Sequence, residues 1–188
     1  MKKENELIRS YMTTQISTLI SQKEKSGGKA RLANLRRGAG KEPGELPELW
    51  GAFLNEIPEE LISSNGRPSR GEWAIYLSLT MFALHQQGNS ESVHAENISL
   101  GKAAKELMKE PNDDERERVL RRFGPVVTAK DMPEFSHHLR SMVQLFSSKG
   151  IKLDYVRLAE DIYYFQTGNR KRVQLSWGED FYYEKGEK

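Results

Sequence analysis

The chain has 188 residues, of which 37% are hydrophobic and 30% charged, so it is long enough for a folded core but polar overall. It contains no cysteine, which excludes a disulfide scaffold, a cysteine-ligated zinc site and a thiol nucleophile. Its longest apolar stretch runs only from Trp73 to Leu84, too short to cross a bilayer, so we expect no membrane partner. The N-terminus leads into no apolar run of the signal-peptide type, and we expect a cytoplasmic protein.

The formal net charge of +2 conceals a strong segregation of charge along the chain. Between Lys23 and Lys41 there are seven basic residues and one glutamate, whereas residues 42–60 contain six glutamates and no basic residue. A second basic group, Arg170-Lys171-Arg172, lies near the C-terminus. Clusters of this kind produce local positive potential of the sort that attracts phosphate, although solvated surface charge explains any single cluster equally well.

In the first half of the chain, apolar residues repeat with helical spacing over 5–22, and we expect this helix to stop at Gly27-Gly28. A short basic helix is predicted over 29–37 and ends at Gly38-Ala39-Gly40. A loop marked by Pro43, Gly44 and Pro47 precedes one or two amphipathic turns between Trp50 and Ile57.

Two helix starts are marked by capping residues. Ser69 and Glu72 have the spacing of a capping box and predict a helix over 70–87, which is apolar enough to be buried on most sides. Residues 88–97 are polar and predict a loop. Ser99 then caps a helix whose inner positions are Leu100, Ala103, Ala104, Leu107 and Met108.

The C-terminal half also has helical spacing. Asp113-Asp114-Glu115 favour a helix start, and Val119, Leu120, Phe123 and Val127 form the inner face of that helix. Pro133 suits the first turn of the next helix, which ends at Gly150, and Asp154 caps another that ends at Gly168. Residues 173–177 fit either a strand or a helix, and we choose the helix because a lone strand has no partner. The predicted fold is all-α, a compact multi-helix bundle, with a division into lobes 1–110 and 111–188 as an alternative.

The sequence does not match the motifs of common enzymes. Gly38-Ala39-Gly40-Lys41 resembles part of a phosphate-binding loop, but Leu35 replaces the required first glycine and Glu42 replaces the required Ser or Thr. The histidines lack the spacing of metal ligands, and we expect His85 to be a buried packing residue. We therefore expect no catalytic residue, no metal, no cofactor and no small-molecule substrate.

Three separated clusters of basic residues favour nucleic-acid binding. Arg118, Arg121 and Arg122 share one helix face, although acids at the start and bases at the end of a helix also complement its dipole. Arg36 and Arg37 close the short basic helix, and their alternative role is to pair with the acidic stretch 42–60. Arginine suits phosphate because its planar guanidinium donates several hydrogen bonds.

Several segments, in their order and spacing, resemble the CasB family, the small subunit of the type I-E CRISPR surveillance complex Cascade. The similar segments include Ala30–Arg37, Leu79–His85, Ile98–Ala103, Arg118–Phe123, His138–Val143, Gly150–Tyr155 and Trp177–Tyr182. The resemblance implies an all-helical, non-catalytic subunit of an antiviral defence complex, present in two copies. Its implied partners are the other Cascade subunits, the crRNA, the target DNA and the displaced non-target strand, and its implied function is R-loop stabilisation.

By position, Arg36-Arg37 and Arg170-Lys171-Arg172 match the nucleic-acid-facing basic residues of the family, with Arg121, Arg122 and Arg140 as further contributors. Together with the clusters above, the candidate nucleic-acid-binding residues are Lys29, Arg31, Arg36, Arg37, Lys41, Arg118, Arg121, Arg122, Arg140, Arg170, Lys171 and Arg172. The alternative function is a structural helical adaptor whose charges bind protein subunits without direct nucleic-acid contact.

Overall fold

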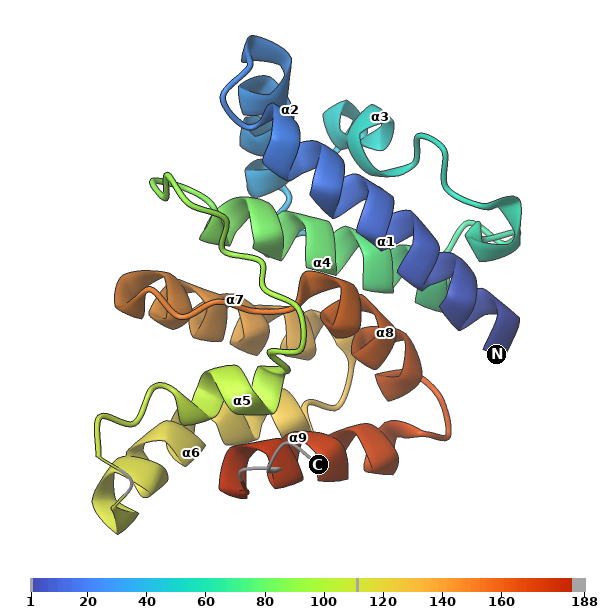
Figure 1. The fold of residues 1–188 in the computed structure, drawn as a ribbon. Coiled ribbons are helices and arrows are strands. Elements are labelled where there is room, and N and C mark those ends of the chain that lie inside the picture. Colours follow the sequence, from blue (N-terminus) through green and yellow to red (C-terminus); the bar gives the residue numbers. More distant parts are fainter. Residues whose placement is uncertain (1, 111, 184–188) are drawn as a thin grey trace.

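The apolar helix predicted near residue 70 lies at the centre of the fold (Figure 1). In the computed structural model, which describes residues 2–110 and 112–183, every residue from Gly71 to Ala83 is buried. This helix, α4 (Arg70–His85), begins with the predicted capping box: the Ser69 hydroxyl accepts from the backbone N–H of Glu72, whose carboxylate accepts from the N–H of Ser69. The remaining α-helices are α1 (Lys2–Gln22), α2 (Ser26–Arg37), α3 (Trp50–Phe53), α5 (Leu100–Lys105), α6 (Asp113–Thr128), α7 (Met132–Lys149), α8 (Tyr155–Phe165) and α9 (Arg170–Tyr182), with 3₁₀ turns η1 (Pro47–Leu49) and η2 (Glu59–Leu61).

The other helices pack around α4 in two groups. Helices α1, α2 and α3 cover one side of α4, while α7 and α8 cover the other, and α8 also lies against α1 (Figure 1). Beyond them, α5 packs against α9, and α6 packs against α7. Among the described residues there is no strand, only an isolated bridge between His94 and Leu153. The all-α prediction is confirmed, and the division into lobes at residue 110 stays a prediction.

The predicted caps of the C-terminal helices also form. The Ser99 hydroxyl accepts from the N–H of Lys102, the Asp154 carboxylate accepts from the N–H groups of Val156 and Arg157, and Gly150 ends α7 in the left-handed conformation. Residues 173–177 lie within α9, so the helical alternative for this segment is confirmed. Packing explains this outcome. Trp177 is fully buried and stacks with Phe135 and Phe165, and as part of a helix it lies on the same buried face as Val173 and Phe181.

Two local expectations are wrong. Gly27 and Gly28 do not end the first helix, which stops at Gln22; they lie inside α2. A Cβ atom at Gly28 would lie within 1.9 Å of the Gln22 carbonyl oxygen, so glycine is needed there for close approach of the two helices. In α6, the expected inner face omitted Val126, which is buried, whereas the expected Leu120 and Val127 are only partly buried against the core.

Candidate nucleic-acid interface

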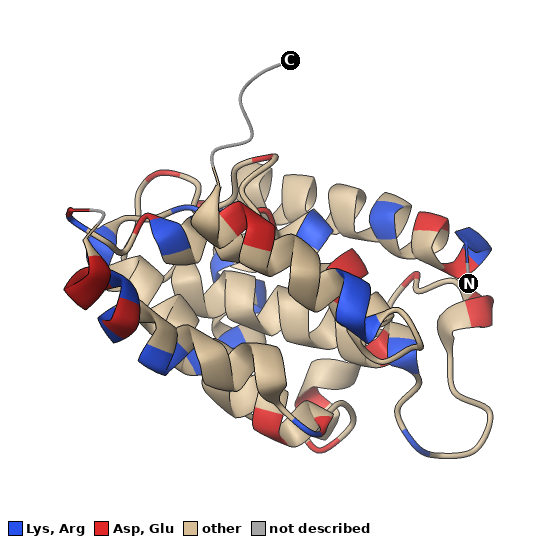
Figure 2. Ribbon diagram, turned by 90° about the horizontal axis from the view of Figure 1, so that it is seen from below, with Lys and Arg blue, Asp and Glu red and all other residues tan. Residues whose placement is uncertain are grey.

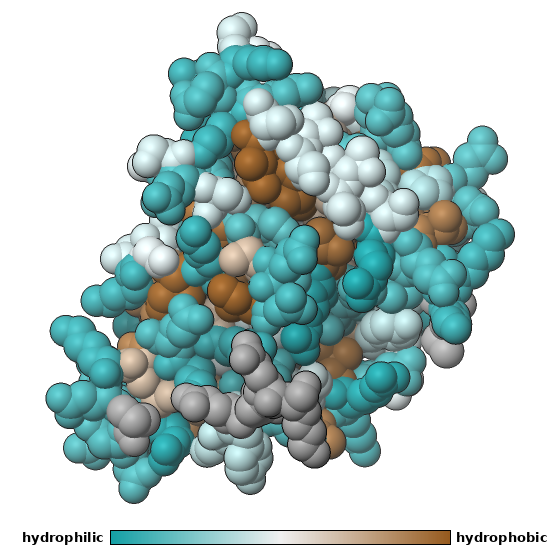
Figure 3. Space-filling model, viewed as in Figure 1, coloured by the Kyte–Doolittle hydropathy of each residue, from teal (hydrophilic) through white to brown (hydrophobic). Residues whose placement is uncertain are grey.

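The basic residues occupy several separate places on the fold and alternate with acidic residues (Figure 2). The face of the molecule in Figure 3 is mainly hydrophilic, with a few smaller hydrophobic areas. The twelve candidate residues belong to three groups: those on α2 and around the turn that follows it, those on α6, and those at the start of α9.

The first group surrounds the turn that follows α2. Gly40 adopts a φ of +90°, and a Cβ atom at this position would lie 3.0 Å from Nη1 of Arg140. The guanidinium of Arg140, from α7, therefore lies directly beside a turn about a hundred residues earlier in the chain. This contact brings Arg140 to the end of the basic segment that contains Arg36, Arg37 and Lys41.

Two cations in this group pair with the acidic stretch that follows them. Nη2 of Arg37 lies 2.7 Å from Oε1 of Glu48, and Nζ of Lys41 lies 2.6 Å from Oε1 of Glu45. The alternative considered for the arginine pair thus holds for Arg37. Arg36 is half-buried and makes no side-chain hydrogen bond or ion pair within residues 2–110 and 112–183.

Two other candidates from the basic segment have local contacts. Nζ of Lys29 lies 3.5 Å from Oε2 of Glu24, and both side chains are exposed. Arg31 joins two helices: its Nη2 donates to the side-chain oxygen of the buried Gln15 in α1 and, at 3.1 Å, to the carbonyl oxygen of Ala52 in α3. The contacts of Arg31 hold the fold together and leave fewer of its donors for a ligand.

The second group lies on α6. Nη2 of Arg118 pairs with Glu115, and Nη1 of Arg121 lies 3.1 Å from Oε1 of Glu117. Arg122 is exposed and has no acidic partner in the described part of the chain. Arg118 and Arg122 line a hollow of about 420 Å³ that Arg121 does not line. Two of the three arginines are therefore grouped around a cavity.

The third group begins α9. The guanidinium carbon of Arg170 lies 4.0 Å above the centre of the Phe165 ring, and its Nε donates to the Phe165 carbonyl oxygen at 3.2 Å. Lys171 and Arg172 are exposed, and neither has an ion-pair partner among the residues described. Arg172 also lines a second hollow of about 420 Å³, together with Arg9 and Arg157.

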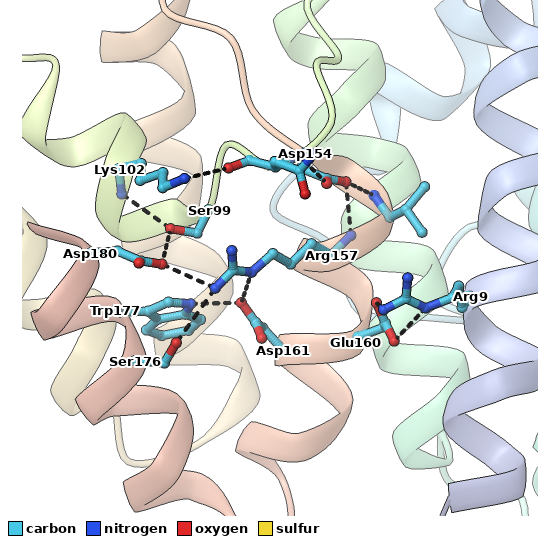
Figure 4. A network of polar contacts seen from close by, with 12 residues as sticks. Arg9, Ser99, Lys102, Asp154, Arg157, Glu160, Asp161, Ser176, Trp177 and Asp180 are labelled. Atoms are coloured by element: carbon cyan, nitrogen blue, oxygen red, sulfur yellow. Dashed lines mark hydrogen bonds and ion pairs between the residues drawn. The ribbon is translucent and has the colours of Figure 1, made fainter. Parts of the chain in front are cut away.

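A buried polar network lies beside this second hollow (Figure 4). Nη2 of Arg157, in α8, lies 3.0 Å from Oδ2 of Asp180 in α9, and the same oxygen accepts a 2.6 Å hydrogen bond from the Ser99 hydroxyl that caps α5. Asp161 accepts from the indole N–H of Trp177 at 2.7 Å. The network joins α5, α8 and α9, so the side chain of Arg157 holds the fold together beside the surface that Arg172 exposes.

The side chain of Arg9 also has an ion-pair partner. Its Nη2 lies 2.7 Å from Oε2 of the buried Glu160, which links α1 to α8. Of the three arginines around this hollow, only Arg172 therefore has no acidic partner within the described ranges.

Two of the four histidines make hydrogen bonds in positions of low exposure. His85 is buried, its Nδ1 lies 2.9 Å from the Tyr155 hydroxyl, and burial lowers its pKa to about 4, so the ring is neutral at physiological pH. Its expected role as a buried packing residue is confirmed. Nδ1 of His94 accepts from the backbone N–H of Tyr155 at 3.1 Å, and burial lowers its pKa also. Across residues 2–110 and 112–183, no three His, Asp or Glu side chains are grouped as a metal site.

Sequence reasoning missed two cations that the fold places beside the predicted ones. Lys109, in the loop before α6, and Lys149, in the last turn of α7, line the same hollow as Arg118 and Arg122. Neither belongs to a basic run in the sequence, so only the packing of α6 against α7 brings them together.

In the described part of the chain, no helix is long and apolar enough to span a bilayer.

This all-helical chain is similar to solved structures of CasB proteins. The crystal structure of CasB from Thermobifida fusca is 28% identical, with a TM-score of 0.79 over 94% of this chain and 98% of that one. CasB from Thermus thermophilus is 22% identical, with a TM-score of 0.68 over 91% of this chain and 97% of that one. CasB from M. ruber is 24% identical, with a TM-score of 0.64 over 89% and 92% of the two chains. The last two comparisons support the fold alone.

Residues 31–182 match the family model for the CRISPR-associated protein Cse2. The chain therefore belongs to the Cse2 (CasB) family of CRISPR-associated proteins, and the family resemblance seen in its sequence is confirmed. Among curated protein sequences, none matches the chain significantly.

Proposed function

We propose that this protein is a non-catalytic small subunit of a type I-E Cascade complex that stabilises the R-loop through contacts to phosphate. Forming an R-loop exchanges one duplex for another of similar stability, so a few protein contacts to the backbone shift the balance. Such contacts require exposed cations at suitable positions and no active site. Family membership supports the assignment to a CRISPR complex, and the cations support the role within it.

The observation that supports this function best is a set of candidate cations without acidic partners in the described chain. These residues lie on four helices, α2, α6, α7 and α9, and represent all three groups described above. They are Arg36, Arg122, Arg140, Lys171 and Arg172. Unpaired arginine and lysine side chains gain more from a phosphate than cations already neutralised by a carboxylate. Separated sites of this kind suit an extended backbone better than a small ligand.

In this role the protein acts in the cytoplasm, as two copies in one complex. Its partners are the other Cascade subunits, the crRNA, the target DNA and the displaced non-target strand. Phosphate contacts of this kind position the strands without reading their sequence. We therefore expect the isolated protein to bind nucleic acid weakly, with little sequence preference and strong salt dependence.

The test uses the complete complex reconstituted with a double variant, Arg36→Ala with Arg140→Ala. R-loop formation is measured on one target over a range of salt concentrations. We expect weaker R-loop formation and a salt dependence reduced by about two phosphate contacts, because each lost contact lowers the slope of log K against log salt by about 0.9.

A matched control removes the same charge elsewhere: Lys3→Ala with Lys152→Ala, whose side chains pair with Glu60 and Glu91 outside the three groups. We expect the control complex to behave like the wild type. Normal R-loop formation with an unchanged salt slope in the Arg36 and Arg140 variant would remove this group from the interface.

The structural adaptor is the second candidate, and one observation favours it. Five predicted residues already have carboxylate partners on the protein: Lys29, Arg37, Lys41, Arg118 and Arg121. An adaptor predicts that removing the unpaired cations weakens assembly with protein subunits while target binding by assembled complexes is unchanged. Measuring both quantities on the same variant separates the two functions.

A further inference from the structure

The hollow between α6 and the end of α7 is lined by both cations and apolar side chains. Its volume is about 420 Å³, within the range of roughly 300–1,000 Å³ found for small-molecule sites. Cations and apolar side chains share its lining, which comprises Glu106, Leu107, Lys109, Arg118, Val119, Arg122, Leu145, Lys149 and Ile151. Its lining residues come from α6, α7 and the segments that follow α5 and α7, and these three helices contact one another.

The cations of this hollow are only partly neutralised. Arg118 pairs with Glu115, whose Oε2 also accepts from the backbone N–H of Lys109. The side chains of Lys109, Arg122 and Lys149 have no acidic partner within residues 2–110 and 112–183. Three unpaired cations against the lining carboxylate Glu106 leave the hollow positive, so it attracts an anion.

The apolar part of the lining comes from both helices. Val119 lies between Arg118 and Arg122 in the sequence of α6, and Leu145 precedes Lys149 by one helical turn on α7. Leu107 and Ile151 add apolar atoms from the adjoining connections. A simple phosphate does not need this apolar surface, whereas a flat heterocyclic base does, since bases removed from a stack pack against apolar or aromatic side chains.

We propose that this hollow binds one nucleotide, with the base against Leu145 and its apolar neighbours and the phosphate at Arg122 and Lys149. The proposal rests on the function proposed above and deepens it, because a strand held by phosphate contacts would also insert a base here. Glu106 also lines the hollow, and its carboxylate adds a hydrogen-bond acceptor there. Adenine, cytosine and guanine carry exocyclic amino donors for such an acceptor, whereas thymine offers only its ring N3–H.

The test compares two labelled single strands of equal length and charge, oligo-dC and the same backbone with abasic sites, using the purified full chain and fluorescence anisotropy. We expect the abasic strand to bind the wild type about tenfold more weakly, because it lacks the base whose apolar surface would be buried against the aliphatic side chains of the hollow. In Arg122→Gln with Lys149→Gln, we expect weaker binding and loss of the difference between the two strands.

Two further variants test whether the base lies against Leu145 and whether the loss of charge acts only at the hollow. Leu145→Ser shortens a partly buried apolar side chain and should reduce the preference for oligo-dC while leaving abasic binding unchanged. The charge-matched control, Lys2→Gln with Lys130→Gln, removes two exposed cations outside the hollow and should keep the preference.

Competition with deoxycytidine monophosphate and with inorganic phosphate identifies the source of the nucleotide. Competition by the mononucleotide at far lower concentration than phosphate supports a nucleotide site. Much stronger binding of the strand than of the mononucleotide then indicates a strand as the natural source, and equal binding indicates a free nucleotide.

Equal affinity of the wild type for oligo-dC and the abasic strand would overturn the nucleotide site while leaving the proposed function intact. The same conclusion follows if the Arg122 and Lys149 variant behaves like the control. Absence of binding to either strand, even at low salt, would count against the proposed function and this inference together.

Discussion

Asp161 accepts a 2.7 Å hydrogen bond from the indole N–H of Trp177. This hydrogen bond joins α8 to a fully buried side chain of α9. The carboxylate sits in a largely buried position close to Arg157, with Nε of that arginine 4.0 Å from its Oδ2. Burial raises the pKa of Asp161 to about 6, and the Trp177 and Arg157 contacts only partly oppose this shift. The charge on Asp161 therefore costs free energy in the folded state.

Asp161→Asn should make the protein more stable at alkaline pH and no more stable at acidic pH. The folded state binds the Asp161 proton more tightly than the unfolded state, so the stability that this proton provides is present below pH 3.8 and is lost as the pH rises through about 6. Above pH 7 we expect the variant to gain about 1–3 kcal/mol in the free energy of unfolding.

Urea unfolding of variant and wild type at pH 4 and pH 8 measures this difference. His85, whose pKa is lowered to about 4, acts in the opposite direction, but its contribution cancels when the two proteins are compared at the same pH. A variant less stable than the wild type at pH 8 would show that the charged form of Asp161 stabilises the network.

Gly101→Ala should destabilise the fold, because α5 and α9 approach closely at this residue. A Cβ atom at position 101 would lie 2.1 Å from the carbonyl oxygen of Trp177, and this oxygen belongs to the backbone of α9, so it cannot rotate away as the end of a side chain could. We expect a loss of about 1–3 kcal/mol from overpacking, measured by chemical denaturation. Gly178→Ala is the matched control, since no atom lies within 4 Å of its Cβ position, and alanine should stabilise α9 by about 0.5–1 kcal/mol.

Arg157→Ala should cost about 2–3 kcal/mol, because it removes a cation from the buried Asp180. The same substitution at Arg121, whose pair with Glu117 is exposed on both sides, should cost less than about 1 kcal/mol. Thermal and urea unfolding of the two variants compare a buried pair with an exposed one at equal change in charge. Equal losses would mean that the Arg157 network contributes no more than surface pairing.

We expect alanine substitution of Arg31 to lower mainly the stability of the fold, and alanine substitution of Arg36 to weaken mainly the binding of nucleic acid. Arg31→Ala removes the contacts to Gln15 and Ala52, and we expect the free energy of unfolding to fall by about 1–2 kcal/mol. Arg36→Ala removes no side-chain hydrogen bond in the described structure and should change stability by less than about 0.5 kcal/mol. Binding of a single strand at low salt, measured on both variants, should weaken more for Arg36→Ala.

Local signals were enough for most of the helices. The capping box at Ser69 and Glu72, the cap at Ser99 and the left-handed glycine at Gly150 act over three or four residues, so their geometry follows from sequence spacing alone. Gly28 was misinterpreted because its role is a close approach to Gln22, which a glycine in a sequence does not reveal. The candidate cations were identifiable by residue type, but their partners were not.

By itself, the sequence determined an all-helical chain, the capped starts of several helices, the absence of cysteine chemistry and a resemblance to the family to which the chain belongs. The tertiary structure alone decided which cations remain unpaired: Arg31 reaches Gln15, Arg37 reaches Glu48, and Arg140 lies beside Gly40. It also brought Lys109 and Lys149 to the hollow beside Arg122. The physical reason is range: caps and periodicity act within one or two helical turns, whereas an ion pair or a cavity depends on how distant helices pack.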